Sequence, residues 1–245
     1  MSSISRIKAI FIKETQDIKT NSNVILMFII PILLTLIYKY MIQGMPEGLA
    51  VTFGLLFLAV MIGMYVPSMI IAEEKEKKTL QVLLLSPAKP VEVFIGKGLL
   101  TFISIIVFGI LLVAIEGNMW DKLPVVLLAL ILVSIPCIFI GMIVGMLAQN
   151  QMATGGIGFP IYMLFLMLPL LTVVNEGNFL ARIASVLPTF HFTQILYKVF
   201  FSEYTFENLY IHFLAIIASC IVIFGLLYVV YRKKGSASIV GVGLK

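Results

Sequence analysis

Residues 73–78 form the densest run of charge in a chain of 245 residues that is 61% hydrophobic and only 12% charged. Glutamate and lysine side chains in such a run can form ion pairs and bind a polar protein surface, but they cannot lie together in hydrocarbon. Leucine and valine dominate residues 80–85, which follow Thr79. An apolar stripe directly after a charged run favours a docking element outside the membrane. A solvated loop is the alternative, but it would need neither the stripe nor the Ser86-Pro87 pair that ends it.

Few other residues have side chains suited to chemistry. Cys137 and Cys220 fall in apolar stretches, where we expect them to pack as small hydrophobic residues. His191 and His212 have no carboxylate at helical spacing, and we expect both to pack at a membrane interface. The sequence contains no CxxC pair, no His-rich tract and no metal-ligand spacing. It therefore predicts no catalytic residue, no metal site and no redox chemistry.

The mean hydropathy of +1.11 and the long apolar runs predict an all-α integral membrane protein. Polar residues run to Asn23 before the first apolar stretch, so no cleavable signal is expected. A helix needs roughly 20 apolar residues to cross a bilayer. Six stretches meet this requirement, and we expect them to form one transmembrane domain over residues 1–245. They are residues 24–42, 49–72, 99–115, 123–148, 157–174 and 209–231.

Lysine and arginine are distributed unevenly over the loops between these spans. With the N-terminus inside, thirteen of the 17 basic residues lie in inner segments, three lie in outer segments, and Lys39 lies in the first span. The positive-inside rule therefore predicts that both termini and the loop at residues 73–98 are cytoplasmic. The net charge of +5 reflects this loop pattern and does not indicate nucleic-acid binding. The excess of lysine over arginine is typical of AT-rich genomes, and we expect a bacterial plasma membrane.

Two segments outside the spans carry further patterns. Residues 1–23 predict an amphipathic helix that lies flat on the inner leaflet, with a solvated leader as the alternative. Residues 175–208 hold two short apolar stretches separated by Pro188. Because each is too short to span, we expect a re-entrant or interfacial hairpin at the outer surface. Its aromatic side chains would anchor it at the headgroups or close an outer exit, with Pro188, Phe190 and Phe192 as the candidate outer gate.

In the order of these segments and in one motif, the chain resembles the ABC-2 family of transporter permeases. The motif is Glu74-Lys75-Glu76-Lys77-Lys78-Thr79-Leu80-Gln81-Val82-Leu83-Leu84-Leu85-Ser86-Pro87. It is similar to the family's acid-base-acid run, Thr-Leu, paired leucines and Ser-Pro. Residues 91–97 and 187–192 also resemble family segments before the third and the last span. The family often has glycine where this chain has Lys78, a better helix former, so the coupling helix is expected to begin earlier here.

The resemblance implies that this chain is the membrane subunit of an ATP-binding-cassette exporter. It has no GxxxxGK[ST] phosphate loop, so a separate nucleotide-binding subunit would bind ATP and Mg²⁺ and hydrolyse the ATP. The chain itself would be no enzyme and would bind no cofactor directly. Its leucines would bury apolar surface in the ATPase, and its charged residues would form a polar rim. The expected docking residues are Glu73, Glu74, Lys75, Glu76, Thr79, Leu80, Leu83 and Leu84.

Small residues in the fourth span predict a close helix contact. Cys137, Gly141 and Gly145 follow a small-xxx-small spacing, which lets another helix approach. Packing within the chain is one interpretation, and contact with a second permease copy or a paralogue is the other. Pro67 and Pro136 are expected to kink the second and fourth spans.

The predicted spans contain no acidic residue, and Lys39 is the only charge within one of them. Transporters of ions or polar solutes more often place ionisable groups there. We therefore expect export of a hydrophobic or amphipathic cargo, such as a drug, a lipid or a membrane-active peptide. A polysaccharide or lipid-linked glycan exporter is the alternative within the family. An ion-coupled secondary transporter and a structural membrane protein are the alternatives outside it.

Overall fold

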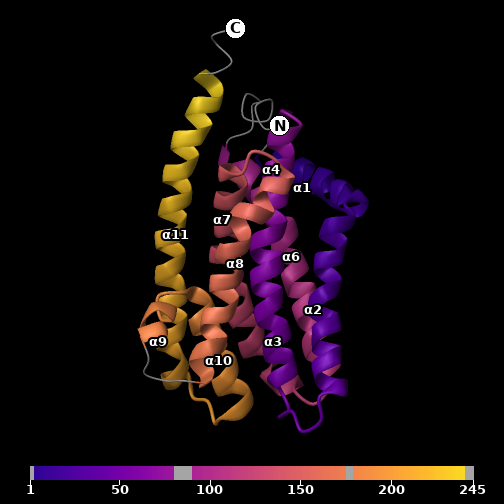
Figure 1. Ribbon diagram of the computed structural model, residues 1–245, viewed down its shortest axis with the longest axis vertical. Coiled ribbons are helices and arrows are strands. Elements are labelled where there is room, and N and C mark those ends of the chain that lie inside the picture. Colours follow the sequence, from indigo (N-terminus) through magenta and orange to yellow (C-terminus); the bar gives the residue numbers. More distant parts are fainter. Residues whose placement is uncertain (1–2, 80–89, 175–178, 241–245) are drawn as a thin grey trace.

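The computed structural model describes residues 3–79, 90–174 and 179–240, which lie in helices and the short connections between them (Figure 1). Six helical segments are long and apolar enough to cross a membrane, as predicted. The second segment runs without a break through α3 (Leu49–Phe57), the π-helix η1 (Leu58–Tyr65) and α4 (Val66–Glu76). The other five are α2 (Ser22–Met41), α6 (Pro90–Glu116), α7 (Leu123–Leu147), α8 (Gln151–Val174) and α11 (Phe206–Val240). A short 3-10 helix, η2 (Trp120–Lys122), precedes α7.

The first described helix and the C-terminal part of the last one lie at the same end of the bundle. α1 (Ser3–Thr20) runs across this end, called the α1 end here, and α11 extends past the other helices there (Figure 1). α9 (Phe179–Ala184) and α10 (Pro188–Phe201) lie at the opposite end, called the α10 end. A helix within residues 1–23 and two short helices within residues 175–208 were expected. Their depth in a membrane stays a prediction.

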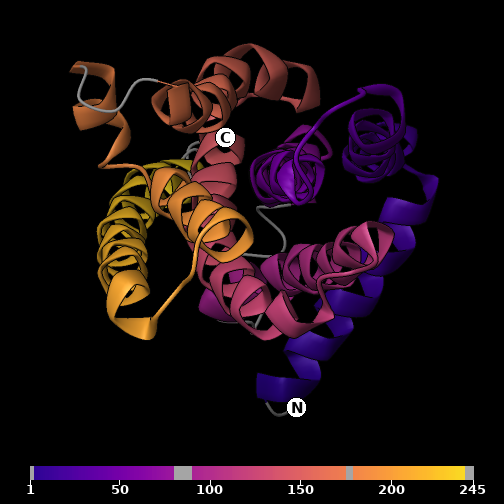
Figure 2. The same ribbon diagram turned by 90° about the horizontal axis from the view of Figure 1, so that it is seen from below.

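The centre of the bundle is formed by α7 and the α3–η1–α4 segment. That segment is 72% buried over its most apolar stretch, whereas α2 and α11 are only 17% and 11% buried. Figure 2 shows α2 and α11 on opposite sides of the bundle. α7 contacts α4, η1, α6, α8, α10 and α11. The core therefore forms around two central helices, and the outer helices leave apolar faces exposed.

The small-residue strip of α7 packs against the second span of the same chain. A Cβ atom added to Gly141 would lie 2.2 Å from the Met64 carbonyl oxygen, and one added to Gly145 would lie 2.6 Å from that of Ser68. Cys137 lies one step along the strip, with its Cβ atom against Gly63. Only glycine lets two backbones approach so closely. Of the two interpretations of the strip, the structure therefore shows the contact within the chain.

A π-helix ends just before Pro67, where the sequence predicts a kink. η1 ends at Tyr65, and Pro67 lies in the first turn of α4 that follows. Proline has no backbone N–H, and its ring clashes with the carbonyl four residues earlier, so a local change to i→i+5 spacing relieves both problems. Pro136, in contrast, lies inside α7 without interrupting the α-helix.

Two helices begin earlier than the spans predicted from the sequence. α6 begins at Pro90 instead of residue 99, and α8 begins at Gln151 instead of residue 157. The third span was expected to start after Lys97 because a lysine inside a membrane helix is costly. Lys97 is buried and ion-paired, so the helix includes it. The predicted loop at residues 73–98 is shorter as a result, and the predicted coupling helix at residues 80–85 lies outside the described residues.

Candidate functional site

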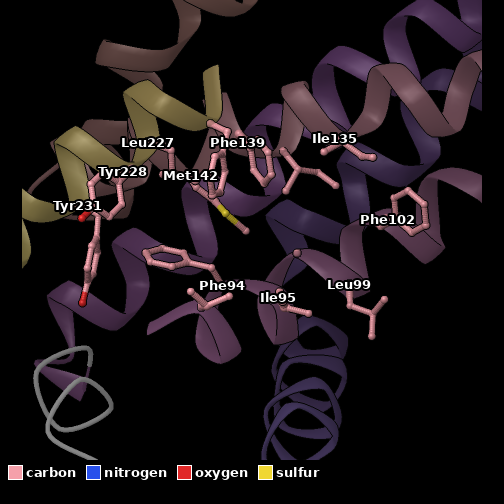
Figure 3. Close-up of a pocket in the computed structure, with 14 residues that line it drawn as sticks. Phe94, Ile95, Leu99, Phe102, Ile135, Phe139, Met142, Leu227, Tyr228 and Tyr231 are labelled. Carbon is pink, nitrogen blue, oxygen red and sulfur yellow. The ribbon is translucent and has the colours of Figure 1, made fainter. Parts of the chain in front are cut away.

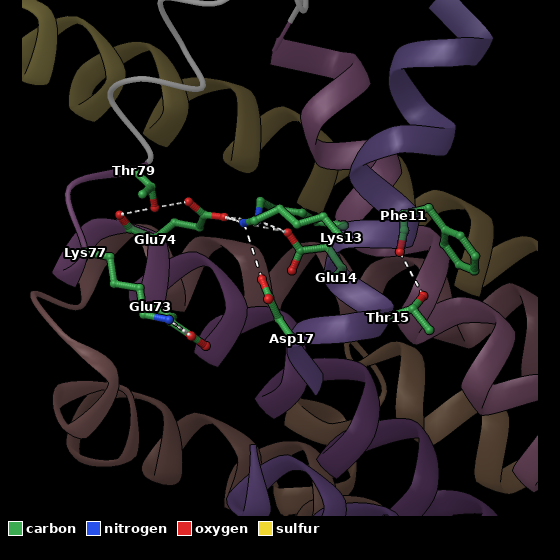
Figure 4. Close-up of polar contacts among 10 residues, drawn as sticks. Phe11, Lys13, Glu14, Thr15, Asp17, Glu73, Glu74, Lys77 and Thr79 are labelled. Atoms are coloured by element: carbon green, nitrogen blue, oxygen red, sulfur yellow. Dashed lines mark hydrogen bonds and ion pairs between the residues drawn. The ribbon is translucent and has the colours of Figure 1, made fainter. Parts of the chain in front are cut away.

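A buried cluster of charged side chains lies at the α1 end (Figure 4). The Lys97 ammonium, whose side chain is 1% exposed, donates hydrogen bonds to Glu14 Oε1 at 2.5 Å and Glu74 Oε1 at 3.0 Å. Both glutamate side chains are buried as well. Lys13 also donates to Glu74 Oε1, and the Thr79 hydroxyl donates to Glu74 Oε2. Glu14, Glu74 and Lys97 are called the ion cluster below.

The ion cluster joins three elements that are far apart in the sequence. Glu14 belongs to α1, Glu74 to the last turn of α4, and Lys97 to the third turn of α6. α4 and α6 are the helices before and after residues 80–89. The Lys97 ammonium therefore holds the two helices that flank this segment to each other and to α1.

Close packing of α1 on α6 brings these charges together. A Cβ atom added to Gly96 would lie 2.7 Å from Ile10 Cγ2 and 3.3 Å from the Ile7 carbonyl oxygen. A larger residue at position 96 would push α1 away from α6 and separate Glu14 from Lys97. The glycine beside Lys97 thus sets the distance that the ion pairs need.

A second ion pair holds α1 to α6 closer to the start of both helices. Arg6 donates from Nε to Glu92 Oε2 and from Nη2 to Glu92 Oε1, each at 2.7 Å, which is the strong two-pronged geometry of arginine and carboxylate. The Ser3 hydroxyl donates to Glu92 Oε1 at 2.6 Å. Glu92 lies in the first turn of α6, where the helix dipole favours a negative charge. α1 is therefore attached to α6 at two separate points.

Other residues of the charged run attach the end of α4 to further helices. The Lys75 ammonium donates to the carbonyl oxygen of Met146 at 2.8 Å and to that of Ala148, at the C-terminal end of α7. Glu76 Oε2 accepts a hydrogen bond from the Gln151 backbone N–H, at the first residue of α8, at 3.1 Å. Lysine at a helix C-terminus and glutamate at a helix N-terminus both complement the helix dipole. The charged run thus contacts α1, α6, α7 and α8.

Lys78 departs from the expectation that the coupling helix begins earlier in this chain. Its φ angle is +58°, in the left-handed region that non-glycine residues rarely adopt. α4 ends at Glu76, so Lys78 does not extend a helix here. The backbone conformation at this position is the one that glycine adopts most readily.

The structure describes five of the eight residues predicted to dock a partner. Glu76 and Thr79 are exposed at the α1 end, and Glu73 is half-buried and pairs with Lys77 at 2.5 Å. Glu74 differs from the prediction of a rim contact, because Lys13 and Lys97 draw its carboxylate inward. Lys75 is likewise bound within the chain. Leu80, Leu83 and Leu84 lie outside the described residues.

Electrostatic balance explains how Glu14, Glu74 and Lys97 can be buried together beside the more exposed Lys13. Burial lowers the pKa of the Lys13 ammonium, but the hydrogen bond to Glu74 and the charges of Glu14, Glu74 and Asp17 outweigh burial and raise that pKa to about 12. With Lys13 and Lys97 positive and Glu14 and Glu74 negative, the four groups sum to no net charge. A buried charge is tolerated when it is paired and hydrogen-bonded in this way.

Sequence reasoning missed Glu14, Lys97, Arg6 and Glu92 as members of the site. One signal was present: Lys97 directly precedes a long apolar stretch, and lysine is almost never fully buried without a partner. The identity of that partner could not be read from the sequence, because Glu14 lies 83 residues away.

At the α10 end, the two histidines form a hydrogen-bonded chain with Lys198. His191 Nδ1 lies 3.1 Å from His212 Nδ1, and His212 Nε2 lies 3.1 Å from the Lys198 ammonium. His191 Nε2 lies 2.9 Å from the Ser185 carbonyl oxygen, to which it must donate. With Lys198 donating to His212 and His212 donating to His191, every contact is satisfied when both imidazoles are neutral. The histidines therefore join α10 to α11, beyond the simple packing role that the sequence predicts.

Acidification is expected to loosen this contact. Burial lowers the pKa of His191 below its ordinary value of 6.5, although the Ser185 carbonyl partly opposes the shift. The folded protein then binds fewer protons than the unfolded chain, so the contribution of His191 to stability is complete above pH ~6.5 and falls as the pH drops below that value. Thermal unfolding should show that the wild type loses more stability between pH 8 and pH 5 than His191→Gln does. That variant keeps a donor for the Ser185 carbonyl. Equal losses would show that His191 does not titrate as described.

The three candidate gate residues lie in the first turns of α10. Pro188 is the first residue of the helix, Phe192 is fully buried in the core, and the Phe190 ring packs against His191 at 5.3 Å between ring centres. Phe192 therefore contributes to the packing of α10. A gating role for the three residues stays a prediction.

A comparison with models of protein families found a match over residues 43–229. The matching family is described as ABC-2 family transporter protein. The matched segment begins after α2 and ends inside α11, so it contains the central helices, the charged run and α10. No curated protein matched the chain.

Proposed function

The chain belongs to the ABC-2 family of transporter proteins, and from this membership we propose that it is the membrane permease subunit of an ATP-driven exporter. A nucleotide-binding subunit would bind ATP and Mg²⁺, hydrolyse the ATP and dock at the α1 end. The observation that carries the proposal is the ion cluster, which attaches the helices flanking residues 80–89 to α1. Force applied to that segment by a docked ATPase would reach three helices at once.

The proposed docking surface combines described residues with the leucine stripe. Glu73, Glu76 and Thr79 supply polar groups at the α1 end, and Leu80, Leu83 and Leu84 would supply apolar contact area. Each buried leucine is worth about 1.5–3 kcal/mol, so three can sustain a stable contact. The charged groups would mainly set orientation and partner choice.

We place the α1 end in the cytoplasm of a bacterial plasma membrane. The positive-inside count supports this orientation, and the described residues add to it, because α1 and residues 75–78 together carry seven of the thirteen basic residues counted as inner. α1 would then lie along the inner leaflet, and α9 and α10 would form the hairpin at the outer surface.

The proposed cargo is hydrophobic or amphipathic. In the described residues of the six spans, glutamates and lysines lie near the helix ends, as Glu74, Glu92, Lys97 and Glu116 do. The middle of each span is left without charge. A pathway built from such helices offers apolar and hydroxyl groups, which favours a drug, a lipid or a membrane-active peptide over an ion.

A second permease copy, or a paralogue, would complete the pathway. The α7 strip is already occupied within the chain, but α8 has an unoccupied surface. A Cβ atom added at Gly155 or Gly156 would meet no other atom within 4 Å, and Met152, Phe159 and Leu164 are exposed on the same helix. Exposed glycines in a membrane helix permit close approach of another helix.

Two aspartates in the leucine stripe should abolish association with the ATPase. Charging Leu83 and Leu84 removes apolar contact area and places two carboxylates in the proposed interface. Leu83→Asp/Leu84→Asp should fail to co-purify the nucleotide-binding subunit that the wild type retains. The matched control is Gln81→Asp/Ser86→Asp, which adds the same charge to the same segment outside the stripe and should keep the partner. Retention of the ATPase by the leucine variant would refute the docking proposal, as would ATP hydrolysis by the purified chain alone.

A further inference from the structure

An apolar groove opens on the side of the bundle between α6, α7 and α11 (Figure 3). Its volume is about 580 Å³, which is within the range of roughly 300–1,000 Å³ for sites that hold small molecules. Phe94 and Phe102 line it from α6, Phe139 and Met142 from α7, and Leu227 and Tyr231 from α11. The groove is separate from the ion cluster, which lies where α6 meets α1 and α4.

The depth of the groove in the membrane follows from the helices that form it. Phe94 and Phe102 lie on either side of Lys97 along α6, so the groove extends from the α1 end toward the middle of the span. Tyr228 and Tyr231 stand at its end nearest the C-terminal part of α11 (Figure 3). Tyrosine is enriched where membrane meets water. With the orientation proposed above, the groove lies in the cytoplasmic leaflet and opens sideways to it.

The chemistry of the lining selects an alkyl chain. A groove of this kind in a bilayer does not favour water, because its walls are aromatic and aliphatic apart from the tyrosine hydroxyls at one end. The aromatic rings from three helices instead provide contact area on several sides of a narrow apolar occupant. Lipid acyl chains are the apolar molecules present at this depth.

Positive charge beside the groove selects the headgroup. Arg232 and Lys233 follow Tyr231 directly on α11, and both side chains are exposed. Basic residues next to a cleft between membrane helices on the cytoplasmic side attract anionic lipid headgroups. An acyl chain in the groove would place its glycerol and phosphate near the tyrosine hydroxyls and these two cations.

We propose that the groove between α6, α7 and α11 binds one acyl chain of an anionic phospholipid from the cytoplasmic leaflet. The bound chain fills the gap between α11 and the α6–α7 pair and contacts the turns of α6 that also carry Gly96 and Lys97. Lipid occupancy and the ion cluster thereby act on the same turns of α6. This site rests on the proposed orientation, but it requires neither the ATPase nor an exported cargo.

Photo-crosslinking in lipid nanodiscs tests the site directly. The full chain is placed in phosphatidylcholine nanodiscs that contain a phosphatidylglycerol or a phosphatidylcholine probe with a photoreactive group in its acyl chain. Mass spectrometry then locates the labelled peptides. The phosphatidylglycerol probe should label residues that line the groove on α6, α7 and α11, about fivefold or more above the phosphatidylcholine probe. Arg232→Gln/Lys233→Gln should remove that preference and leave labelling by both probes.

A variant with a larger side chain in the groove tests where the lipid binds. Ile95 lines the groove and is 48% exposed, while Leu111 is 42% exposed on the same helix outside the groove. Ile95→Trp should suppress labelling of the groove, and Leu111→Trp should leave it unchanged. Labelling spread evenly over the exposed faces of α2 and α11 would overturn the proposal. If a Leu99→Cys variant formed a disulfide-linked dimer and the groove was then no longer labelled, a second copy would cover the groove and the proposal would be overturned. Because the assay contains no ATPase, a failure of the docking proposal leaves its result unaffected.

Discussion

Replacing Lys97 with methionine is expected to destabilise the folded chain by about 3–5 kcal/mol. The Lys97 ammonium lies 2.5 Å from Glu14 Oε1 and 3.0 Å from Glu74 Oε1, and it supplies the positive charge that both carboxylates need. Its side chain is only 1% exposed. Removing it leaves two buried carboxylates with one remaining ammonium, Lys13, between them. Unfolding of the purified chain by heat or denaturant in detergent measures the effect.

Two further variants separate the loss of pairing from a simple change of side chain. Lys77→Met removes a lysine of the exposed pair with Glu73 and should change stability by about 1 kcal/mol or less. Lys97→Met/Glu14→Gln/Glu74→Gln removes the buried charges together and should recover much of the lost stability. A single Lys97→Met variant as stable as the wild type would show that the ion cluster does not hold α1, α4 and α6 together.

Gly141→Ala is expected to destabilise the fold by about 3 kcal/mol, the upper end of the range for overpacking. The added methyl group would lie 2.2 Å from the Met64 carbonyl oxygen and 2.8 Å from its carbonyl carbon. These are backbone atoms of a buried π-helix, which cannot rotate away as a side chain would. The helices α7 and η1 would have to separate, and thermal unfolding of the purified variant would show the loss.

Gly156→Ala is the control for this prediction because the substitution is the same and the surroundings are empty. No atom lies within 4 Å of an added Cβ at position 156 in α8. Alanine is the better helix former by about 0.5–1 kcal/mol, so this variant should be as stable as the wild type or slightly more stable. If the two alanine variants unfolded alike, the contact of α7 with η1 would not be the tight one described.

The apolar spans could be predicted from the sequence because each needs only its own residues to be recognised. A stretch such as α7 is apolar along its whole length, so length and hydropathy suffice. The charged run at residues 73–78 was equally visible, because its local charge contrasts with the rest of the chain. The strip of Cys137, Gly141 and Gly145 was found by spacing, but spacing alone could not say which helix it contacts.

What the sequence could not provide are the contacts between distant residues. Lys97 looked like a loop residue because its partners, Glu14 and Glu74, belong to other helices. The true start of α6 at Pro90 was missed for the same reason. Pro67 predicted a kink, whereas the π-helix that precedes it could not be read from the sequence. The pairing of His191 with His212 likewise follows from the packing of α10 on α11.

The central claim is that the ion cluster transmits ATP-driven movement from the docking segment to the membrane helices. Double electron–electron resonance tests this claim by comparing two proteins, each bound to the nucleotide-binding subunit. One has the wild-type ion cluster, and the other is Lys97→Met/Glu14→Gln/Glu74→Gln. Spin labels at Met41 and Leu171, both exposed toward the α10 end, report the distance between α2 and α8. That distance should change on addition of ATP in the wild type and stay constant in the triple variant, although the ATPase remains bound. The same ATP-dependent change in both proteins would contradict the account.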